Sequence, residues 1–355
     1  MKNKNIIITS SGTGGHIYPG IALAEEFKNK GYNPIFFIGN NPISLEILEN
    51  SQFKYIKFNM SGMPRKISIT FLIFLIKTEF SFLKALKLII KLNPLAVIGT
   101  GGYMAIPVLF AAKMLRKKIF IHEQNVIPGK ANRLLNKIVD KAFISFPGSK
   151  KKFKNATILG CPIRKSLLLA SKEKALLELK LKREVFTILV FAGSLGATKF
   201  NEIVCKVLLG LHTKDKFQTL HITGPKNYIK IQEKSKDNPD YRVFDYMHNI
   251  AIAYAISNII ICRSGASTVL ELKALDKSAI LIPYPYATND HQYWNAKEIE
   301  ENDKVVIIEE KNLTEENLRK AIYTIKKNTR NNTVKNIIEF PQELIVKEII
   351  KCIRS

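Results

Sequence analysis

Short apolar runs alternate with helical patterns along most of the chain. The run at residues 5–9 is β-branched and continuous, and it leads directly into a glycine-rich turn at 12–16. Uninterrupted apolar runs of this length are typical of strands buried on both faces of a parallel sheet. A helical pattern then begins near Pro19, which suits a first helical turn, and ends near Gly31, where a left-handed cap is expected. The N-terminal segment therefore predicts a strand, a glycine turn and a helix.

The same arrangement recurs halfway along the chain. The apolar run at 186–191 leads into a small-residue turn at 192–197, and a helical pattern follows at 199–211. Further strand-like runs alternate with helical patterns, at residues 34–38, 96–98, 118–121, 220–223, 259–262 and 279–283. Such alternation is the signature of parallel α/β sheets. We therefore expect an α/β protein with two Rossmann-like lobes, with the boundary region in the charged segment 166–183, which lacks strand signals.

The length of the chain fits two domains, and its net charge fits several classes of anionic partner. With 355 residues, of which 46% are hydrophobic, the chain can bury the cores of two domains. Its formal net charge of +25 attracts nucleic acid, anionic lipid and phosphorylated substrates alike. The lysines are scattered and form no single basic block, so charge alone does not select among these partners.

Cysteine usage and the lengths of the apolar runs indicate a cytoplasmic protein. The cysteines Cys161, Cys205, Cys262 and Cys352 include no CxxC pair and no metal-ligand spacing, which fits a reducing compartment. The apolar run at the N-terminus is too short for a secretory signal. The longest uncharged apolar stretch, 67–76, is well below the ~20 residues that span a bilayer, so no transmembrane helix is expected.

Two glycine loops follow predicted strands in the N-terminal half. The first reads Gly-Thr-Gly-Gly-His over residues 12–16, and the second reads Gly-Thr-Gly-Gly-Tyr over 99–103. Open parallel sheets bind ligands beyond the carboxyl ends of their strands, and glycines let backbone N–H groups approach a phosphate there. Two such loops in one lobe suggest a pyrophosphate cradle with His16 beside it, although one loop alone is also an ordinary tight turn.

Three other predicted strands end in polar or small residues. One leads into the tetrad His-Glu-Gln-Asn at 122–125, whose hydrogen-bonding groups are costly to bury unpaired, although loop residues of this kind also cap helices. Another passes through the turn at 262–266 into a helix, an arrangement that can hold a diphosphate. Glu271 in that helix either accepts hydrogen bonds from two ribose hydroxyls or forms a capping box with Thr268. The loop at 283–296 includes the only Trp and has the composition of a sugar-contacting surface.

Together these segments resemble the family-28 glycosyltransferases that add N-acetylglucosamine to the lipid-linked peptidoglycan precursor. Seven motifs stand in the family's order over nearly the whole chain, namely GTGGHIYPG at 12–20, GTGGY at 99–103, HEQN with a following PG at 122–129, GCPIR at 160–164, GSLGA at 193–197, CRSGASTVLE at 262–271 and HQYWNA at 291–296. Each motif is common by itself, but seven in order are specific. The resemblance implies a GT-B fold, in which two Rossmann-like lobes face a cleft.

The resemblance also implies a division of labour between the lobes. Residues 1–164, with a C-terminal helix at 341–355 packed back on them, would form the acceptor and membrane-docking lobe, and residues 165–340 the lobe that binds UDP-N-acetylglucosamine (UDP-GlcNAc). The implied donor-binding residues are Arg164, Ser194, Met247 through its backbone to uracil, Ala266, Ser267, Thr268, Val269, Leu270, Glu271 and Gln292, completed from the other lobe by Thr13, Gly14, Gly15 and Asn125. Gly101, Gly102 and Tyr103 would contact the acceptor pyrophosphate. The family's Gln and Asn are replaced here by Leu195 and Cys161, so neither position is assigned to the site.

The implied reaction is an inverting transfer to the 4-hydroxyl of MurNAc in undecaprenyl-pyrophosphoryl-MurNAc-pentapeptide (lipid I), which gives the β-1,4 linkage of lipid II. A positioned base should take the hydroxyl proton. His16 is the first candidate because the ordinary pKa of histidine lies near neutrality; Glu123 is the rival, and His16 would otherwise position the acceptor phosphate. No acidic metal-binding motif stands in a suitable loop, so we expect no metal and no cofactor, with helix N-termini and backbone amides stabilising the leaving diphosphate.

A lipid-linked acceptor requires docking, as a peripheral protein, on the anionic cytoplasmic face of the bacterial inner membrane. At ~100° per residue, a helix over 68–92 separates four lysines from five apolar residues. The lysines are Lys77, Lys84, Lys87 and Lys91, and the apolar residues are Phe71, Leu75, Phe82, Leu86 and Ile89. This pattern suits an interface with anionic lipid, and it equally describes a core-facing helix with a solvated lysine face.

Two other enzymatic functions remain open on sequence alone, and a third, non-enzymatic function is disfavoured. Non-hydrolysing UDP-GlcNAc 2-epimerases share the donor and the architecture but need no lipid acceptor. A diacylglycerol glucosyltransferase is the nearest competitor among transferases, although the segments 122–125 and 291–296 favour the peptidoglycan enzymes. A nucleic-acid-binding protein would explain the charge, but it needs a recognised module or aromatics interleaved on a basic face. The sequence shows neither, so no nucleic-acid partner is expected.

Overall fold

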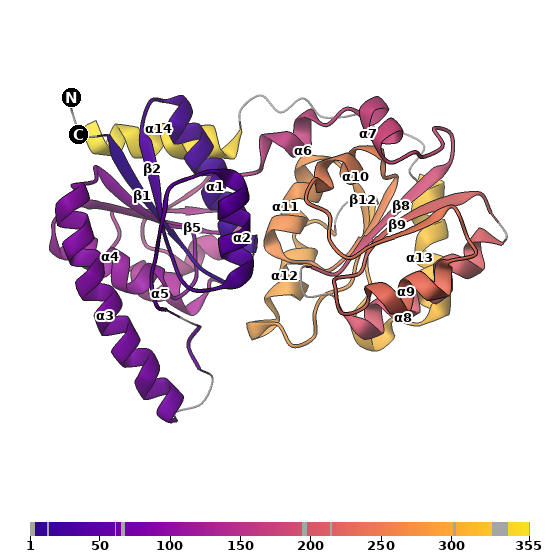
Figure 1. Cartoon of the computed structure of the whole chain (residues 1–355), viewed down its shortest axis with the longest axis horizontal. Helices are drawn as coiled ribbons and strands as arrows, with labels where there is room; N and C mark the ends of the chain where they lie inside the picture. Colours follow the sequence, from indigo (N-terminus) through magenta and orange to yellow (C-terminus); the bar gives the residue numbers. More distant parts are fainter. Residues whose placement is uncertain are drawn as a thin grey trace. The chain divides into compact units, whose positions relative to one another are not determined.

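A computed structural model describes residues 4–12, 14–60, 62–64, 68–193, 197–213, 215–300, 303–328 and 340–354. The chain forms two units (Figure 1). Unit 1 extends to Arg164 and includes the C-terminal helix α14 (Pro341–Arg354), and unit 2 begins at Lys165. Thr13 and Ser194, which the resemblance implies as donor contacts, and the substituted position 195 lie outside the described residues.

Unit 1 is built on a parallel sheet of seven strands in the order β3-β2-β1-β4-β5-β6-β7. The strands are β1 (Asn5–Ser10), β2 (Asn33–Ile38), β3 (Tyr55–Lys57), β4 (Ala96–Gly99), β5 (Lys118–Glu123), β6 (Lys141–Ile144) and β7 (Ala156–Ile158). Ile7 of β1 pairs in parallel with Ile35 of β2 on one side and with Val97 of β4 on the other. This is the doubly wound order of a Rossmann-like sheet, as the alternating sequence pattern predicts.

Helices cover both faces of this sheet. They are α1 (Gly14–Asn29), α2 (Pro42–Ser51), α3 (Ile69–Leu92), α4 (Ala105–Met114), α5 (Lys130–Leu135) and the short 3₁₀ helix η1 (Pro147–Lys152), together with α14. Successive strand side chains point to opposite faces. Ile7 therefore packs in the core under α3 and α4, whereas Ile6 and Ile8 pack in the core under α1 and α14. In Figure 1, α3 runs alongside α4 and its N-terminal end extends beyond the sheet.

Helix α1 begins at Gly14, earlier than the start near Pro19 that the sequence predicts. Pro19 lies inside the helix, where it lacks the N–H for one helical hydrogen bond and its ring crowds the carbonyl four residues earlier. The side chain of Ile17 is fully buried and anchors the turn before the proline. Gly14, Gly15 and His16 consequently form the first helical turn instead of a loop ahead of it. At the other end, Gly31 has a φ of 75° and forms the predicted left-handed cap.

Unit 2 has a parallel sheet of six strands in the order β10-β9-β8-β11-β12-β13. The strands are β8 (Phe186–Phe191), β9 (Phe217–Ile222), β10 (Tyr241–Phe244), β11 (Ile259–Cys262), β12 (Ser278–Leu281) and β13 (Val305–Ile307). The helices are α6 (Lys165–Leu169), α7 (Lys172–Glu178), α8 (Thr198–His212), α9 (Tyr228–Ser235), α10 (Ile250–Ile256), α11 (Ala266–Ala274), α12 (His291–Lys297) and α13 (Glu315–Asn328), with 3₁₀ turns η2 (Thr288–Asp290) and η3 (Glu310–Asn312). The two parallel sheets confirm the predicted α/β class with two Rossmann-like units.

The charged segment 166–183 contains two short helices. Helices α6 and α7 pack against α10 of unit 2, and they bury Leu167 and Ala175. The segment lacks strand signals because it is helical, and most of its charged side chains lie on the surface. It therefore belongs to the body of unit 2.

Candidate functional site

The strand order of unit 1 brings its two glycine loops together. β1 and β4 are hydrogen-bonded neighbours, and the order of strands along the sheet reverses between them. Connections that leave such neighbours toward opposite faces open a crevice in which α/β sheets bind ligands. Two hydrogen bonds join the loops there: the Ser11 N–H donates to the Gly101 carbonyl at 3.3 Å, and Thr100 Oγ1 donates to the His16 carbonyl at 2.9 Å.

His16 lies against the second glycine loop. A Cβ atom on Gly101 would come within 2.3 Å of His16 Nδ1, and a Cβ on Gly12 would lie 3.5 Å from His16 Cδ2. Gly101 also has a φ of 118°, which side-chain-bearing residues rarely adopt. Gly101 is therefore needed both for the turn and for the space that the imidazole occupies. The imidazole is half-buried in the first turn of α1.

Gly102 lets the same loop approach Ser11 closely. A Cβ on Gly102 would lie 2.3 Å from Ser11 Oγ and 2.4 Å from the Ser11 carbonyl oxygen. Ser11 Oγ in turn accepts a hydrogen bond from the Met104 N–H at 3.3 Å. Tyr103 packs edge-on against Phe74 with 5.9 Å between ring centroids, and burial raises the pKa of its phenol. The sequence did not mark Ser11 as a site residue, because a single serine after a strand carries no pattern.

Both carboxylate oxygens of Glu123 are engaged inside unit 1, where this side chain is 1% exposed. Oε1 accepts hydrogen bonds from the backbone N–H of Asn125 at 2.9 Å and from its side-chain amide at 3.1 Å. Oε2 accepts from the Gly129 N–H at 3.0 Å and from Asn132 Nδ2 at 2.9 Å. A buried carboxylate with these donors organises the loop between β5 and α5, and it is poorly placed to receive a proton from a substrate.

His122 is buried beside His16. Its Nε2 lies 3.0 Å from the Gly160 carbonyl oxygen and 3.4 Å from Ser145 Oγ. Burial is the main cause that lowers the pKa of His122 to about 4; the nearby His16 lowers it further, and the hydrogen bond to Gly160 opposes the shift. The ring is therefore neutral at physiological pH, and its role is to hold the backbone at Gly160.

Arg164 is the last residue of unit 1, and its guanidinium lies over the ring of Tyr18, 3.9 Å from the ring centroid. Tyr18 belongs to α1, and its ring also borders Gly14, where a Cβ would lie 3.1 Å from the ring. The structure thus gathers Gly14, Gly15 and Arg164 around the start of α1. The other predicted donor contact of this unit, Asn125, stands after β5 with its side chain bound to Glu123.

In unit 2 the strand order reverses between β8 and β11, which pair in parallel. The loop after β8 contains Gly193, with a φ of 89°, and the loop after β11 leads into α11. Gly265 is the N-cap residue of α11, so Ala266, Ser267 and Thr268 are the first three residues of the helix. The first N–H groups of a helix have no partner within it and carry its positive dipole end. This is the anion-binding arrangement that the sequence predicts for the segment.

The capping-box interpretation of Glu271 is wrong, because the helix begins ahead of Thr268 and Gly265 takes the N-cap position. Glu271 is 8% exposed, and its Oε2 accepts a hydrogen bond from the Tyr254 phenol at 3.1 Å. The sequence did not mark Tyr254 as a partner of Glu271, because Tyr254 belongs to the apolar pattern of α10. Met247, the predicted uracil contact, is half-buried between β10 and α10.

Gln292 and a group of exposed aromatic residues follow β12. Gln292 Oε1 accepts a hydrogen bond from the Tyr284 N–H at 3.0 Å, which ties α12 to the end of the strand. Tyr284, Tyr286 and Trp294 are 43%, 73% and 48% exposed, and the two tyrosines pack edge-on with 5.6 Å between centroids. Exposed aromatic rings are suited to stacking on sugars, in line with the composition of the loop.

Arg263 is used within unit 2 to join three loops at the same edge of the sheet. Its Nη1 donates to the carbonyls of Ile282 and Pro283 at 3.1 and 3.2 Å, and its Nη2 pairs with Glu310 at 2.5 Å. Its side chain is buried, so the ion pair with Glu310 compensates its charge. Among the described residues, no group of three or more His, Cys, Asp or Glu is placed to hold a metal ion.

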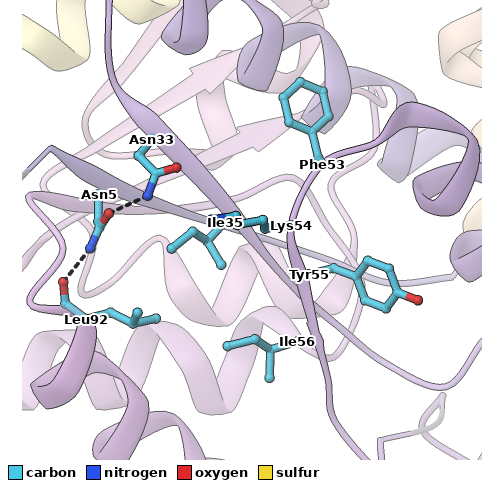
Figure 2. Close-up of a pocket in the computed structure, with 8 residues that line it drawn as sticks. All are labelled: Asn5, Asn33, Ile35, Phe53, Lys54, Tyr55, Ile56 and Leu92. Carbon is cyan, nitrogen blue, oxygen red and sulfur yellow. Dashed lines mark hydrogen bonds between the residues drawn. The ribbon is translucent and has the colours of Figure 1, made fainter.

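The apolar hollow drawn in Figure 2 lies elsewhere, at the opposite edge of the unit 1 sheet. Its volume is about 520 Å³, and its walls include Ile35, Phe53 and Leu92. Asn5 and Asn33, the first residues of β1 and β2, form one rim, where Asn33 donates to Asn5 at 2.7 Å. The glycine loops follow the carboxyl ends of the strands, so this hollow is separate from the candidate site.

Family models match both units of the chain. The model described as the glycosyltransferase family 28 N-terminal domain matches residues 6–144, and the model described as the family 28 C-terminal domain matches residues 187–350. Two curated relatives carry the name UDP-N-acetylglucosamine--N-acetylmuramyl-(pentapeptide) pyrophosphoryl-undecaprenol N-acetylglucosamine transferase. The relative from Halothermothrix orenii is 36% identical and covers 89% of each chain, and that from Desulforamulus reducens is 35% identical and covers 98% of each chain.

Solved structures share the fold at lower identity. The crystal structure of Acinetobacter baumannii MurG matches with a TM-score of 0.72 at 24% identity, over 98% of this chain and 99% of that chain. The UDP-GlcNAc 2-epimerase from Neisseria meningitidis, bound to UDP-GlcNAc, matches with a TM-score of 0.64 at 13% identity, over 98% of this chain and 100% of that chain. Because a transferase and an epimerase both share this fold, the fold alone does not separate the two reactions.

Proposed function

The chain belongs to glycosyltransferase family 28, and we propose that it transfers N-acetylglucosamine from UDP-GlcNAc to the 4-hydroxyl of MurNAc in lipid I, forming the β-1,4 linkage of lipid II. The relatives that carry this transferase name align with it over most of their length. The observation that carries the proposal within the structure is the start of α11 at the switch point of the unit 2 sheet, with Glu271 buried in the same helix.

We infer that unit 2 holds the donor. The N–H groups at the start of α11 suit the diphosphate of UDP-GlcNAc, and the Glu271 carboxylate suits two ribose hydroxyls. The Met247 backbone is the proposed partner of uracil, and Gln292 that of the sugar. Family resemblance further assigns donor contacts to Ser194, Val269 and Leu270, and to Thr13, Gly14, Gly15, Asn125 and Arg164.

We propose His16 as the base of the transfer. It stands in the first turn of α1 in contact with Gly101, whereas the carboxylate of the rival Glu123 is occupied by four donors. In the proposed step, the imidazole takes the proton of the 4-hydroxyl while its oxygen bonds to C1 of N-acetylglucosamine. The bond from C1 to the donor oxygen breaks, its electron pair leaves with UDP, and the configuration at C1 inverts.

The diphosphate of UDP and the pyrophosphate of the acceptor are both negatively charged, so the protein must supply hydrogen-bond donors to each. UDP leaves as an anion, and the N–H groups at the start of α11 would stabilise it. The family resemblance assigns Arg164 to the same ligand. The backbone of Gly101, Gly102 and Tyr103 is the proposed contact for the acceptor pyrophosphate. No step of this proposal uses a metal or a cofactor.

Release of UDP from UDP-GlcNAc, measured with and without a short-chain lipid I analogue, tests the proposal. We expect release only with the analogue, and a fall in kcat of about 10²- to 10⁴-fold in His16→Ala. Formation of UDP-ManNAc from UDP-GlcNAc alone would identify an epimerase instead. Transfer to diacylglycerol in preference to the lipid I analogue would assign the chain to another class of transferase.

We also propose that unit 1 docks on the anionic cytoplasmic face of the bacterial inner membrane through α3. No helix in the described part of the chain combines the length and the apolar content that crossing a bilayer requires. An undecaprenyl-linked acceptor nevertheless stays at the membrane surface. The outer face of α3 carries large apolar side chains that are 44% to 75% exposed, namely Ile69, Leu72, Ile73, Leu75, Ile76, Phe80, Leu83 and Ile90.

The distribution of side chains on α3 differs from the predicted one. Ile89 is buried, and Phe71, Phe82 and Leu86 are partly buried, so most of the predicted apolar side faces the core of unit 1. Leu75, from the same predicted set, is exposed. The helix is apolar around most of its circumference, which a division into one lysine side and one apolar side does not capture. The exposed apolar residues instead share the outer face with the lysines.

Charge reversal on α3 tests the docking proposal. Lys84 is a poor choice, because its Nζ donates to the Lys57 carbonyl at 2.6 Å. Lys87→Glu combined with Lys91→Glu should weaken sedimentation with phosphatidylglycerol vesicles about tenfold or more and leave UDP binding unchanged. Lys320→Glu with Lys327→Glu, on α13 of unit 2, makes the same change in net charge and serves as the control. Equal vesicle binding by both double variants would show that unit 1 does not dock on the membrane through α3.

A further inference from the structure

The segment 160–164, which ends in Arg164, is held in unit 1 by two side chains, one from α14 and one from β5. Gln342 of α14 is 1% exposed; its Oε1 accepts from the Ile163 N–H at 3.2 Å, and its Nε2 donates to the Ile163 carbonyl at 3.0 Å. His122 Nε2 lies 3.0 Å from the Gly160 carbonyl oxygen. The backbone that leads into Arg164 is therefore held at two points, Gly160 and Ile163.

The side chain of Arg164 is fixed by a separate contact, with Tyr18. The guanidinium carbon lies 3.9 Å from the centroid of the Tyr18 ring, and both side chains are half-buried. The same ring borders Gly14 in the first turn of α1. The Tyr18 ring therefore contacts both the glycine turn and the guanidinium, and it limits the positions that the guanidinium can take.

A fixed plane matters for an arginine that binds phosphate. The guanidinium is a planar fork, and it donates two parallel hydrogen bonds to phosphate oxygens only when the fork faces them. A flexible arginine must lose rotamer freedom when its ligand binds, which weakens binding. Stacking on an aromatic ring covers the face of the guanidinium and not its edges, which carry the N–H donors. The aromatic ring thus fixes the side chain before the ligand arrives.

We propose that Tyr18 is a positioning residue that holds the Arg164 guanidinium ready for the diphosphate of the donor, on a backbone that Gln342 keeps in place. This inference rests on the proposed function, in which Arg164 contacts a phosphate group of UDP-GlcNAc. Tyr18 itself contacts no reacting atom in the proposed reaction. Its effect on donor binding must therefore pass through Arg164 and disappear when Arg164 is removed.

A double-mutant cycle on UDP binding tests the proposal. Calorimetric titration with UDP would compare the wild type with Tyr18→Phe, Tyr18→Leu, Arg164→Ala and the combination of Tyr18→Leu with Arg164→Ala. We expect Arg164→Ala to raise the Kd for UDP about tenfold or more, Tyr18→Leu to raise it about threefold to tenfold, and Tyr18→Phe, which keeps the ring, to stay within about twofold. Adding Tyr18→Leu to Arg164→Ala should change the Kd no further.

Steady-state kinetics with the lipid I analogue supply the second readout. Tyr18→Leu should raise the KM for UDP-GlcNAc by the same factor as the Kd while kcat changes less. The control is Tyr32→Leu, which removes another tyrosine of unit 1 that packs edge-on against Phe27. It should leave the Kd for UDP unchanged even if thermal unfolding shifts. If Tyr18→Leu does not fold, Tyr18→Met takes its place, because methionine fills the volume without a ring.

The outcomes separate this inference from the proposed function. Equal weakening by Tyr18→Leu with and without Arg164 would overturn the inference, because Tyr18 would then act through the fold or the glycine turn. Wild-type affinity in Arg164→Ala would overturn both the inference and the assignment of Arg164 to the donor site, while transfer to lipid I could still be observed. Coupling of the two residues in UDP binding, without any transfer to lipid I, would support the inference and reject the proposed reaction.

Discussion

The phenol of Tyr254 donates a hydrogen bond of 3.1 Å to Glu271 Oε2 in the interior of unit 2. Tyr254 is 1% exposed and Glu271 is 8% exposed, so neither side chain can replace this partner with bulk water easily. The two residues come from different helices, α10 and α11. Tyr254 therefore orients the carboxylate that the proposed function assigns to the ribose hydroxyls.

Tyr254→Phe should weaken UDP binding by about tenfold, because the hydrogen bond to a charged group is lost and the carboxylate loses its orientation. It should also lower the preference for UDP over 2′-deoxy-UDP, since Glu271 would hold the 2′-hydroxyl less well. Calorimetric titration with both nucleotides measures the two effects. An unchanged preference accompanied by a lower melting temperature would mean that Tyr254 only supports the fold.

Gly101→Ala should lower kcat by about 10²-fold or more, because the new methyl group takes the space of the His16 imidazole. The φ of 118° adds backbone strain of about 1–3 kcal/mol, which should appear as a lower melting temperature. Gly62→Ala is the matched control, since a Cβ there meets no atom within 4 Å. Initial rates at saturating UDP-GlcNAc and lipid I analogue give the comparison. Full activity in Gly101→Ala would show that His16 is not the base of the transfer.

Glu123→Gln should act on stability more than on proton transfer. The amide would place an N–H₂ group among four hydrogen-bond donors, at a cost of about 3 kcal/mol in the free energy of unfolding. Because His16 is the proposed base and protonation removes a base, we expect the wild type to lose activity at low pH. The same loss should persist in Glu123→Gln. A pH profile of kcat that becomes flat on the acid side in Glu123→Gln, and not in His16→Ala, would reverse the assignment.

Buried His221 should make the protein less stable in mild acid. Its Nδ1 lies 2.7 Å from Tyr241 Oη, its Nε2 lies 3.1 Å from Asn201 Oδ1, and burial lowers its pKa from 6.5 to about 3. Between these values the unfolded chain binds a proton that the native ring does not, so stability falls as the pH drops below 6.5, by about 1.4 kcal/mol per pH unit.

Urea denaturation at pH 7 and pH 5 measures this effect. The loss of unfolding free energy between the two pH values should be about 2 kcal/mol smaller in His221→Gln than in the wild type. His122 in unit 1, whose pKa is lowered to about 4, contributes in the same direction. His248→Gln, at an exposed position, is the control and should show the wild-type loss. An identical loss in His221→Gln would contradict the expected coupling.

The central strands were predictable because their burial leaves a local signature. The runs at 186–191 and 259–262 coincide with β8 and β11, which are buried on both faces and are therefore apolar apart from Thr187. The short strands β3 and β7 have only three residues each and partly exposed side chains, so no long apolar run marks them. The start of α1 was misplaced because a proline that usually opens a helix lies inside this one.

The sequence by itself determined the two Rossmann-like sheets and the loops that end their central strands, because strand burial and glycine turns are properties of consecutive residues. Only the tertiary structure decided how those loops are held. Tyr18 under Arg164, Gln342 on Ile163 and Tyr254 on Glu271 each join different elements of the fold. Such contacts depend on strand order and helix packing, which bring distant residues together without leaving any periodic pattern in the chain.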